Sequence, residues 1–300
     1  MSNKILLTGA SGFVGRNILP ILEKSYDVDT IGRKDGNTYV CDLSTASPEL
    51  TDDYDIVYHV AGKAHTVPRT EAEAKVFFDV NYQGTVNLCK ALEKRKAPKS
   101  FIFLSTVAVY GCDYGENITE EHPLDGTTPY ALSKKRAEEY LSKWCKERNI
   151  KLTILRPSLI AGPNPPGNLG AMIHGIKTGL YASIAGGRAH KSVLMVDDLA
   201  NIVPLCAAKG GIYNMCDDAQ PTFGDLGILI AHQLGKGKPL NIPSWMATCM
   251  AKVGDLLGSK APINSLKLKK ITESLTFSNE KAKRELGWKP LPVMENFKIK

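Results

Sequence analysis

A tyrosine and a lysine four residues apart could form an acid–base pair. Tyr130 and Lys134 lie in the segment PYALSK, where a proline at the start predicts the first turn of a helix. Residues four apart share one face of a helix. A neighbouring cation stabilises a phenolate, so we expect Lys134 to lower the pKa of Tyr130 below the value of about 10 found in free tyrosine. Such a tyrosine could pass a proton to or from an alcohol or carbonyl oxygen.

Two hydroxyl residues at a strand end could hold the same oxygen. The apolar run FIFL leads into Ser105 and Thr106. Strand ends in a parallel sheet face the ligand crevice, so we predict that Thr106 and Tyr130 meet there. Taken alone, PYALSK would equally suit an aromatic residue at a helix N-terminus followed by a surface lysine. The glycine turn described next favours the chemical interpretation.

A glycine-rich turn follows the first apolar run. The segment LLTGASGFVG places Gly9, Gly12 and Gly15 three residues apart, between a predicted strand and a predicted helix. Glycine allows a sharp turn and close approach of the backbone to a pyrophosphate, which then lies at the helix N-terminus. The turn therefore predicts dinucleotide binding by the stretch from Gly9 to Gly15. A tight strand–helix turn without a ligand is the alternative.

The end of the second predicted strand bears on the choice of cofactor. An acid there would bond the ribose 2′-hydroxyl and indicate NAD, but the sequence has Gly32 followed by Arg33. An arginine can pair with a 2′-phosphate, which favours NADP(H). NAD(H) remains possible if Asp29 or Asp35 contacts the ribose. Asp42, after a further short strand, could accept a hydrogen bond from the adenine amino group.

The elements that must position these residues alternate between strands and helices. Apolar runs rich in Val, Ile, Leu and Phe are separated by stretches with helical periodicity, which predicts a doubly wound parallel sheet of the Rossmann type in the α/β class. The predicted strands are 4–8, 27–31, 55–61, 100–105 and 151–156, and the predicted helices are 13–24, 79–96 and 130–149.

A change in composition near residue 157 suggests a domain boundary. The segment RPSLIAGPNPPGNLG contains four prolines and three glycines in 15 residues, which is typical of a loop or crossing. We predict a dinucleotide-binding domain over 1–157 and a smaller substrate-binding lobe over 158–300. The chain is expected to return to the sheet around 190–215.

Composition excludes several classes of function. The 300 residues are 43% hydrophobic and 23% charged, with a formal charge of +7. This charge is either a solvated basic face or an attraction for an anionic ligand, and nucleic acid is not expected because no aromatic residues interleave with a basic stripe. Seven cysteines without a C-x-x-C pair suggest a reduced cytoplasmic chain without a metal site, and we expect no signal peptide. WMATCMAKVGDLLG is too short to span a membrane and carries Lys252 and Asp255, so we predict an amphipathic helix without membrane insertion.

The motifs together resemble the extended short-chain dehydrogenase/reductase family, in its nucleotide-sugar branch. The segments TGASGFVG, CDL, HVAG, NYQGTVNL, FLSTVAVYG, PYALSK, LRPSLIAGP, VLMVDDLANIV and SNEKAKRELGWKP follow the order of that family over nearly the whole chain. The resemblance implies a Rossmann domain with a C-terminal substrate lobe. It implies Thr106, Tyr130 and Lys134 as the catalytic set, with Lys134 also holding the nicotinamide ribose. It further implies a homodimer formed by the Tyr130 helix and the helix before it.

The same resemblance implies sets of binding residues. Asn168 and Lys191 match positions that contact the substrate diphosphate, although Lys191 replaces an arginine and so loses its forked geometry. Arg188 could substitute for that arginine, and His65 could face the sugar. The implied cofactor set is Gly9, Ser11, Gly12, Phe13, Val14, Gly15, Arg33, Asp42, Leu43, Ala61, Gly62, Asn81, Tyr130, Lys134 and Pro157, and the substrate set is Thr106, Tyr130, Asn168, Arg188 and Lys191.

The resemblance leaves several reactions to compare. Thr106 is followed by Val107 and Ala108 instead of the acids that a dehydratase carries, so dehydration is disfavoured. Arg33 favours NADPH-dependent reduction, and the resemblance suggests a UDP-4-keto-6-deoxyhexose or its N-acetylamino form in surface-polysaccharide biosynthesis. The alternatives are an NAD-dependent UDP-hexose 4-epimerase and a non-catalytic dinucleotide sensor. Intact Tyr130 and Lys134 argue against the sensor.

Overall fold

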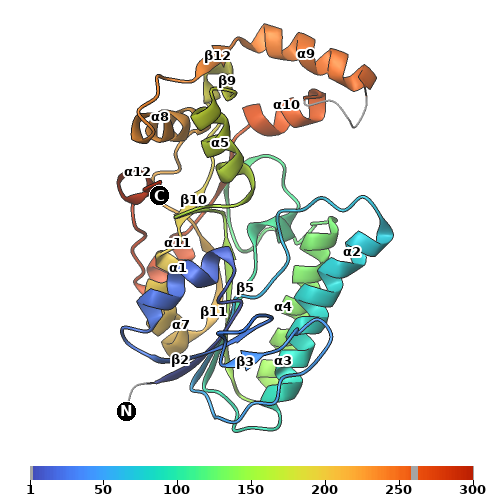
Figure 1. Cartoon of the computed structure of the whole chain (residues 1–300), viewed down its shortest axis with the longest axis vertical. Coiled ribbons are helices and arrows are strands. Elements are labelled where there is room, and N and C mark those ends of the chain that lie inside the picture. The colour runs from blue at the N-terminus through green and yellow to red at the C-terminus, as the bar shows by residue number, and fades with distance from the viewer. Residues whose placement is uncertain (1–2, 258–262, 300) are drawn as a thin grey trace.

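A parallel sheet of seven strands forms the centre of the larger half of the molecule (Figure 1). The computed structural model describes residues 3–257 and 263–299. The strand order is β11-β7-β5-β4-β1-β2-β3, so the order reverses beside β1, and every neighbouring pair is parallel. The predicted Rossmann-type sheet is therefore confirmed. The strands are β1 (Lys4–Thr8), β2 (Asp27–Gly32), β3 (Tyr39–Val40), β4 (Ile56–His59), β5 (Ser100–Leu104), β7 (Lys151–Pro157) and β11 (Gly211–Met215).

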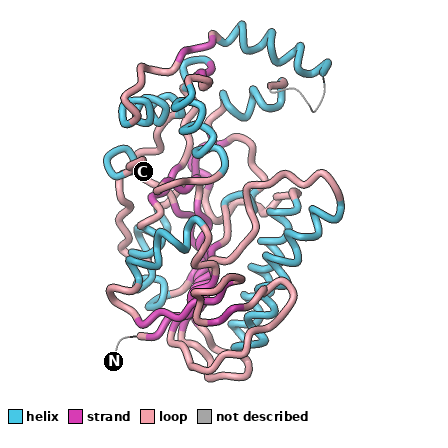
Figure 2. Tube along the Cα trace, in the orientation of Figure 1, coloured by secondary structure: helices cyan, strands magenta, loops and turns pink. Residues whose placement is uncertain are grey.

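Helices cover both faces of this sheet, as the cyan segments on either side of the strands show (Figure 2). Alternate strand residues serve the two faces, because successive side chains of a strand point to opposite sides. Ile5 and Leu7 join one core cluster, whereas Leu6 between them joins the other. The face with Ile5 and Leu7 is covered by α1 (Phe13–Leu22), α6 (Asp198–Asn201), α7 (Val203–Lys209) and α11 (Glu280–Leu286). The face with Leu6 is covered by α3 (Gly84–Leu92) and α4 (Pro129–Glu147), and α2 (Glu71–Phe78) packs on α4.

A second lobe lies beyond the carboxyl ends of the strands and has its own core (Figure 1). Leu169, Ile176, Leu226, Ile230 and Phe297 are buried in it. Its elements are β8 (Leu159–Ala161) paired with β10 (Val193–Met195), β9 (Ala182–Ile184) paired with β12 (Leu240–Ile242), α5 (Gly167–Thr178), α8 (Phe223–Gln233), α9 (Ser244–Leu257), α10 (Ser265–Thr272) and α12 (Val293–Asn296). Between the halves lie β6 (Gly115–Ile118) and its partner β13 (Leu275–Phe277).

The chain passes between the two halves more than once. After β8, β9 and α5 it returns through α6 and α7 to β11, which pairs with β7 at the edge of the sheet. It then forms α8 to α10 in the second lobe and comes back again at α11, which packs against β11 and α7. The range 158–300 thus contributes one strand and three helices to the larger half.

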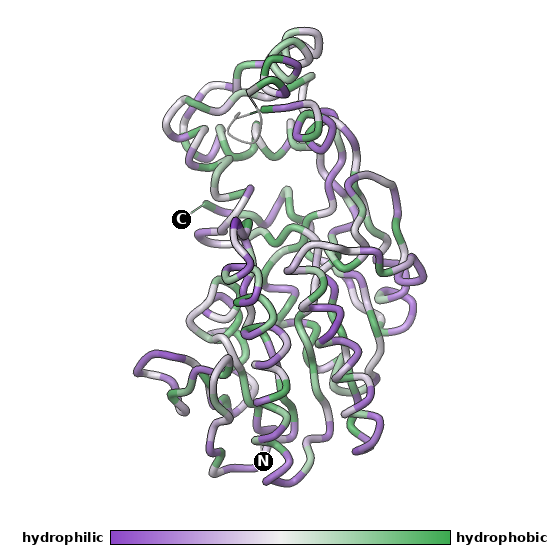
Figure 3. Tube along the Cα trace, turned by 90° about the vertical axis from the view of Figure 1, so that its right-hand side faces the viewer, coloured by the Kyte–Doolittle hydropathy of each residue, from purple (hydrophilic) through white to green (hydrophobic). Residues whose placement is uncertain are grey.

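Hydrophobic residues concentrate along the strands and the helix faces that cover them (Figure 3). WMATCMAKVGDLLG forms α9, the predicted helix, except for its last residue, which lies outside the described ranges. Within residues 3–257 and 263–299, no helix is long and apolar enough to cross a membrane, and no group of three or more His, Cys, Asp or Glu side chains is placed to hold a metal ion. All seven cysteines are free thiols.

Candidate active site

The glycine turn connects β1 to α1, and two of its three glycines pack tightly against the backbone of neighbouring residues. Gly9 has φ 76°, and a Cβ on it would lie 2.7 Å from the backbone of Ala61. A Cβ on Gly15 would lie 2.1 Å from the Gly9 carbonyl oxygen. Gly12 is exposed, and within 4 Å its Cβ would meet only that carbonyl oxygen, at 3.2 Å. Packing therefore requires Gly9 and Gly15, whereas Gly12 leaves open space at the N-terminus of α1.

The N-terminus of α1 has the properties of an anion site. Its N-cap is Gly12, and no side chain caps the first turn, so the first N–H groups of this ten-residue helix are free to bind a ligand such as a pyrophosphate. Ser11 is exposed beside Gly12, and Phe13 and Val14 begin the helix as half-buried residues. These residues fit the phosphate part of a dinucleotide.

An exposed arginine follows the carboxyl end of β2. Arg33 comes directly after Gly32, and its charge is near enough to Asp42 to affect that carboxyl group. Hydrogen bonds from Ser44 and, to a smaller extent, the charge of Arg33 lower the pKa of Asp42. Leu43 is buried next to it. Arg33 and Asp42 therefore lie together at the edge of the sheet where an adenosine would be expected.

An asparagine fills the space that Gly32 leaves. A Cβ on Gly32 would lie 2.5 Å from Nδ2 of Asn37, and that Nδ2 donates a hydrogen bond of 2.7 Å to the Lys34 carbonyl oxygen. A carboxylate side chain at position 32 would thus require Asn37 to move. Sequence reasoning missed Asn37, because an asparagine five residues along a loop carries no recognisable motif.

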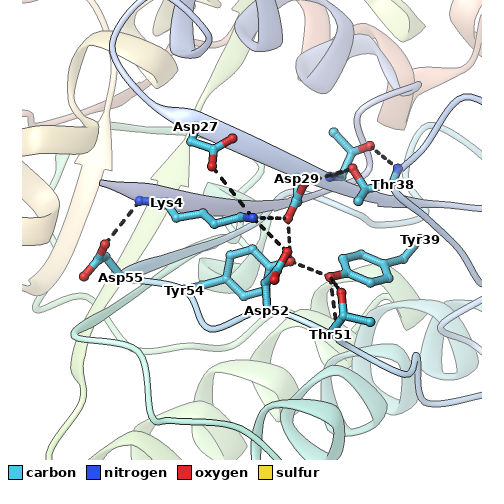
Figure 4. Close-up of polar contacts among 10 residues, drawn as sticks. Lys4, Asp27, Asp29, Thr38, Tyr39, Thr51, Asp52, Tyr54 and Asp55 are labelled. Carbon is cyan, nitrogen blue, oxygen red and sulfur yellow. Dashed lines mark hydrogen bonds and ion pairs between the residues drawn. The ribbon is translucent and has the colours of Figure 1, made fainter. Parts of the chain in front are cut away.

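The carboxylate of Asp29 forms ion pairs and hydrogen bonds within a cluster of polar side chains (Figure 4). Its Oδ2 lies 3.0 Å from Nζ of Lys4 and accepts a 2.8 Å hydrogen bond from the Tyr54 hydroxyl. Thr38 donates to its other oxygen at 3.2 Å. Burial alone would raise the pKa of Asp29, but the hydrogen bonds from Lys4 and Tyr54 outweigh it and the pKa is lowered. The alternative that Asp29 contacts a ribose therefore loses its support.

The Thr106 hydroxyl is near enough to that of Tyr130 to act on its pKa. Thr106 follows β5 and caps a short 3-10 helix, where its Oγ1 accepts from the Ala108 N–H at 3.1 Å. Tyr130 is the second residue of α4, whose N-cap Thr128 accepts from the Ala131 N–H. The capping hydroxyls of Thr106 and Thr128 thus fix the backbone at the start of both helices. This brings Thr106 close to Tyr130, as we expected from the sequence.

The expected effect of Lys134 on Tyr130 is wrong for this structure. Burial raises the pKa of Tyr130, and the nearby Thr106 hydroxyl opposes this only in part. Nζ of Lys134 instead donates to the Leu104 carbonyl oxygen at 2.7 Å and lies over the Phe103 ring. Burial lowers the pKa of Lys134 to about 8, against the charge of Glu138. Tyr130 is therefore a protonated phenol at neutral pH.

Asn81 and Gly62 lie against the same lysine. Asn81 is buried in a π-helical turn (Asp79–Gln83) between α2 and α3, a distortion that often marks functional sites. Its Oδ1 accepts from the Lys63 N–H at 2.7 Å, and its Nδ2 donates to Ser133 at 2.9 Å. A Cβ on Gly62 would lie 3.1 Å from both Asn81 Oδ1 and Lys134 Nζ. A side chain at position 62 would therefore crowd Asn81 and Lys134.

A buried histidine that sequence reasoning missed links these parts. On one side of the ring, His59 Nδ1 lies 2.6 Å from the Thr8 hydroxyl, and that hydroxyl accepts from the Ala61 N–H. On the other side, Nε2 lies 2.9 Å from the Thr85 hydroxyl, and that hydroxyl donates to the Asn81 carbonyl oxygen. These partners fix Nε2 as the protonated nitrogen. Burial, aided by the charge of Lys134, lowers the pKa of His59 to about 3. His59 is therefore a neutral link that holds Ala61 and Asn81 in place.

A buried ion pair lies one helical turn beyond Lys134. Glu138 and Arg156 are 2.6 Å apart, with side chains only 5% and 3% exposed. Ser105 donates a hydrogen bond to Glu138, and Arg156 donates to the Tyr110 hydroxyl at 3.0 Å. Sequence reasoning did not single out Glu138, although its spacing of four residues from Lys134 places both on one face of α4.

The predicted sugar-side residues lie where the two halves meet. Asn168 is exposed in the first turn of α5. A Cβ on the preceding Gly167 would lie 2.8 Å from Nδ1 of His65. His65 has φ 61°, an unusual backbone conformation for a residue with a side chain. Pro157, at the end of β7, is buried and pairs with Met215.

The two candidate diphosphate cations differ in their contacts. Nζ of Lys191 donates to the carbonyl oxygens of Lys270 and Glu273 at 3.1 and 2.8 Å, so it caps the carboxyl end of α10. Burial lowers the pKa of Lys191. Arg188 is exposed and has no side-chain hydrogen bond or ion pair with residues 3–257 or 263–299. Arg188 is thus the cation that is free to bind an anion.

Comparison with known proteins identifies the family. Residues 5–216 match the NAD dependent epimerase/dehydratase family. The N-acetyl-alpha-D-glucosaminyl-diphospho-ditrans,octacis-undecaprenol 4-epimerase of Escherichia coli O157:H7 is 28% identical, with 94% of this chain and 89% of that protein aligned. The GDP-6-deoxy-D-mannose reductase of Pseudomonas aeruginosa is 26% identical over 77% of this chain and 80% of that protein.

A solved structure shows the same fold. The UDP-glucose 4-epimerase of Thermotoga maritima, in complex with UDP-glucose, superposes with a TM-score of 0.72 at 22% identity, covering 98% of this chain and 96% of that chain. The glycine turn, the Thr106–Tyr130 pair and buried Lys134 lie in the part of the chain that the family match covers. The protein is an enzyme of the NAD dependent epimerase/dehydratase family, within the extended short-chain dehydrogenases/reductases that act on nucleotide sugars.

Proposed function

We propose that the protein reduces the 4-keto group of a diphosphate-linked sugar with NADPH. The proposed substrate is a UDP-4-keto-6-deoxyhexose or its N-acetylamino form, used in surface-polysaccharide biosynthesis. One observation carries the choice of cofactor. β2 ends at Gly32, exposed Arg33 follows it, and Asn37 fills the space that an acidic side chain at position 32 would need. A guanidinium at this position favours a 2′-phosphate, whereas an acid would favour a free 2′-hydroxyl.

Tyr130 can supply the proton that the proposed reduction needs. Reduction of a ketone adds a hydride to carbon and a proton to oxygen, and the nicotinamide supplies the hydride chemistry when it is bound. Tyr130 is a half-buried phenol with the Thr106 hydroxyl nearby. Tyr130 can therefore donate the proton while Thr106 holds the same oxygen.

A second candidate is a 4-epimerase that retains NAD. It is favoured by the E. coli relative, a 4-epimerase aligned over most of both chains. The substrate named for that relative joins its sugar through diphosphate to undecaprenol instead of a nucleoside. The family alone does not separate the two reactions, because it contains both that epimerase and a reductase.

The diphosphate of either substrate would lie near Arg188 and Asn168. Both side chains are exposed in the second lobe, whereas Lys191 donates to the carboxyl end of α10. We therefore assign the main cationic contact to Arg188. The Arg188→Ala change should raise KM more than it lowers kcat, because the diphosphate is bound equally in the ground and transition states. An unchanged KM would remove Arg188 from the substrate site.

Cofactor titrations test the proposal. Arg33→Ala should weaken NADPH binding by about 1.5–3 kcal/mol, the scale of a hydrogen bond to a charged group, and should leave NADH binding nearly unchanged. Lys34→Ala is the matched control, since it removes the next exposed cation and should affect neither cofactor by more than about 1 kcal/mol. Equal losses for NADPH and NADH in Arg33→Ala would contradict the assignment.

A turnover assay separates the two reactions. A reductase incubated with a UDP-4-keto-6-deoxy sugar should oxidise one NADPH for each product formed. An epimerase should instead interconvert two UDP-hexoses with no net change in cofactor, and tightly held NAD should co-purify with it. Interconversion without net NADPH oxidation would favour the second candidate.

A further inference from the structure

The outermost helix of the second lobe turns its apolar side away from the protein. α9 (Ser244–Leu257) lies at the end of the lobe farthest from the sheet (Figure 1). Trp245 is 69% exposed, Val253 58% and Leu256 88%. Met246, Met250 and Cys249 are exposed as well. We call these six residues the outer face of α9.

The spacing of these residues forms one stripe. Trp245, Cys249, Val253 and Leu256 follow one another at intervals of four, four and three residues, which places them on a single side of the helix. Met246 and Met250 extend the stripe on one flank. A surface helix normally directs such a stripe into the core.

The inner side of α9 is made of small residues. Among residues 244–256 of the helix, Ala247, Ala251 and Gly254 are the buried positions, and α10 is the element that α9 packs against most closely. Small residues let the two helices approach each other but bury little apolar area. The six residues of the outer face are thus left exposed, which calls for a partner.

The surroundings of this face are strongly basic. Between residues 236 and 270 the sequence contains seven lysines and a single acid, Asp255. Lys269 and Lys270 form ion pairs with Glu273 and Asp113, which lie outside this range. Asp255 accepts hydrogen bonds from Ser265 at the start of α10. Lys236 and Lys238 are exposed just before β12, and Lys252 is exposed on α9 itself. A partner that combines an apolar interior with negative charge fits this surface.

We propose that the outer face of α9 binds to an anionic lipid bilayer. The apolar stripe would enter the boundary between headgroups and acyl chains, as amphipathic helices do when they lie in a membrane surface. Trp245 suits that depth, because an indole prefers the membrane interface. The exposed lysines would contact lipid phosphates, at a gain of about fivefold in affinity for each lysine.

This binding would place the substrate lobe against the membrane without crossing it. α9 packs on α10, and α10 also contacts the short helical turn at Ala185–Gly187, directly before Arg188. The membrane contact and the proposed diphosphate cation are therefore connected through one helix. The inference concerns where the protein works, and it stands whichever reaction the site catalyses.

Flotation with lipid vesicles tests the proposal. The full chain should float with vesicles of phosphatidylethanolamine and phosphatidylglycerol, and much less with vesicles of phosphatidylcholine alone. The double variant Val253→Asp/Leu256→Asp should reduce binding at least tenfold, about the scale of one lost apolar side chain. Val40→Asp is the matched control, because Val40 is 57% exposed on β3 in the other half of the molecule, and it should bind like the wild type.

Tryptophan fluorescence locates the contact. Of the three tryptophans, Trp144 and Trp288 are each only 4% exposed, whereas Trp245 is 69% exposed. Anionic vesicles should therefore shift the emission to shorter wavelength, and lipids with brominated chains should quench it. Trp245→Phe should remove both signals and still float, since it keeps an aromatic residue in the stripe. Binding without any change in the Trp245 signal would overturn the placement of α9.

Two outcomes would refute the proposal. One is a double variant that folds, judged by its thermal unfolding and NADPH binding, and floats like the wild type. The other is vesicle-independent self-association of the wild type that the double variant abolishes, which would assign the outer face to a second copy of the chain. Failure of vesicle binding would leave the cofactor titrations unaffected, so the two proposals fail separately.

Discussion

At the scale of single residues, burial determines how the acid–base groups behave. Tyr130 is half-buried and Lys134 is buried, and burial raises the pKa of the phenol and lowers that of the amine to about 8. Each shift favours the neutral form. The phenol is therefore held as a proton donor, and the charge of Lys134 depends on the one nearby acid, Glu138.

Removing the hydroxyl of Tyr130 should abolish most of the activity. Tyr130→Phe should lower the single-turnover rate of hydride transfer by about 10²–10⁴, the range for a positioned acid–base group, at saturating cofactor. Cofactor binding should stay nearly intact. Tyr140→Phe, on the same helix, is the control and should react like the wild type. A Tyr130→Phe enzyme with the wild-type rate would exclude Tyr130 as the proton donor.

Glu138 should set the basic limit of the pH profile. Lys134 carries its charge below a pKa of about 8 and loses it above, and the charge of Glu138 raises that pKa. In Glu138→Gln the pKa of Lys134 should fall further, so activity should decline from a lower pH than in the wild type. Loss of the buried partner of Arg156 should also destabilise the fold by about 3–5 kcal/mol.

The pH dependence of kcat and the free energy of unfolding check this prediction. Glu139→Gln provides a matched control, because Glu139 is the next residue of α4 but is exposed. It should change neither quantity. An unmoved basic limb in a folded Glu138→Gln enzyme would show that Glu138 only supports the structure.

At the scale of elements, two glycines of the β1–α1 turn are needed for packing, and the third leaves room for a ligand. Its first and third glycines are in close contact with backbone, whereas the middle one faces open space. The same substitution at two of these positions should therefore have different effects. This distinction was not available from the spacing of the three glycines.

Gly15→Ala should destabilise the protein, and Gly12→Ala should weaken cofactor binding. A Cβ on Gly15 would lie 2.1 Å from a carbonyl oxygen, so α1 must shift at a cost of about 1–3 kcal/mol. A Cβ on Gly12 has one contact, at 3.2 Å, so it should change the free energy of unfolding by less than about 1 kcal/mol. It would, however, enter the space proposed for the pyrophosphate. Denaturant unfolding and NADPH titration of both variants test this; equal unfolding free energies would contradict it.

At the scale of the whole molecule, buried carboxylates hold the C-terminal segment to the rest of the chain. Asp198 in α6 accepts from the Leu291 N–H at 3.0 Å, and Asp217 after β11 accepts from the Val293 N–H at 2.8 Å. Burial raises the pKa of Asp198 to about 7, against the hydrogen bond from Leu291. The contact between the two halves is therefore sensitive to pH.

Stability should fall as pH rises from the unfolded to the folded pKa of Asp198. The folded pKa lies above the value of about 3.9 expected in the unfolded chain, so protonation favours the fold fully below pH 4 and this contribution is lost by about pH 7. The shift corresponds to roughly 4 kcal/mol. Asp198→Asn keeps an acceptor for Leu291 and should remove this slope between about pH 4 and 7.

Denaturant unfolding at several pH values measures that slope. Asp197→Asn is the control, because Asp197 is the adjacent acid and is only half-buried. It should retain the wild-type pH dependence. An Asp198→Asn protein with the same pH dependence as the wild type would show that Asp198 is ionised in the fold.

The predicted homodimer also belongs to this scale. Leu132 of α4 is 36% exposed, so the outer side of this helix offers some apolar surface. Dimerisation through α4 stays a prediction. It involves a different surface from the outer face of α9, so the two kinds of contact can form in one molecule.

Local patterns determined the class of fold and the centre of the site. The alternation of apolar runs with helical periodicity is a property of neighbouring residues, and it was sufficient to predict the parallel sheet that is confirmed here. The spacing of Tyr130 and Lys134 and the turn from Gly9 to Gly15 are also local. Such features can be predicted from sequence because the periods of helices and strands fix which side chains share a face.

Only the tertiary structure decided how the site residues are charged and which of them are free. Asp29 binds Lys4, 25 positions away, and Lys191 caps the end of α10. Asn37 folds back over Gly32, and burial reverses the expected shift of the pKa of Tyr130. Contacts between distant residues and loss of water depend on how the elements pack. No local sequence pattern records them, so the sequence alone could name the chemical groups but not their protonation states or their partners.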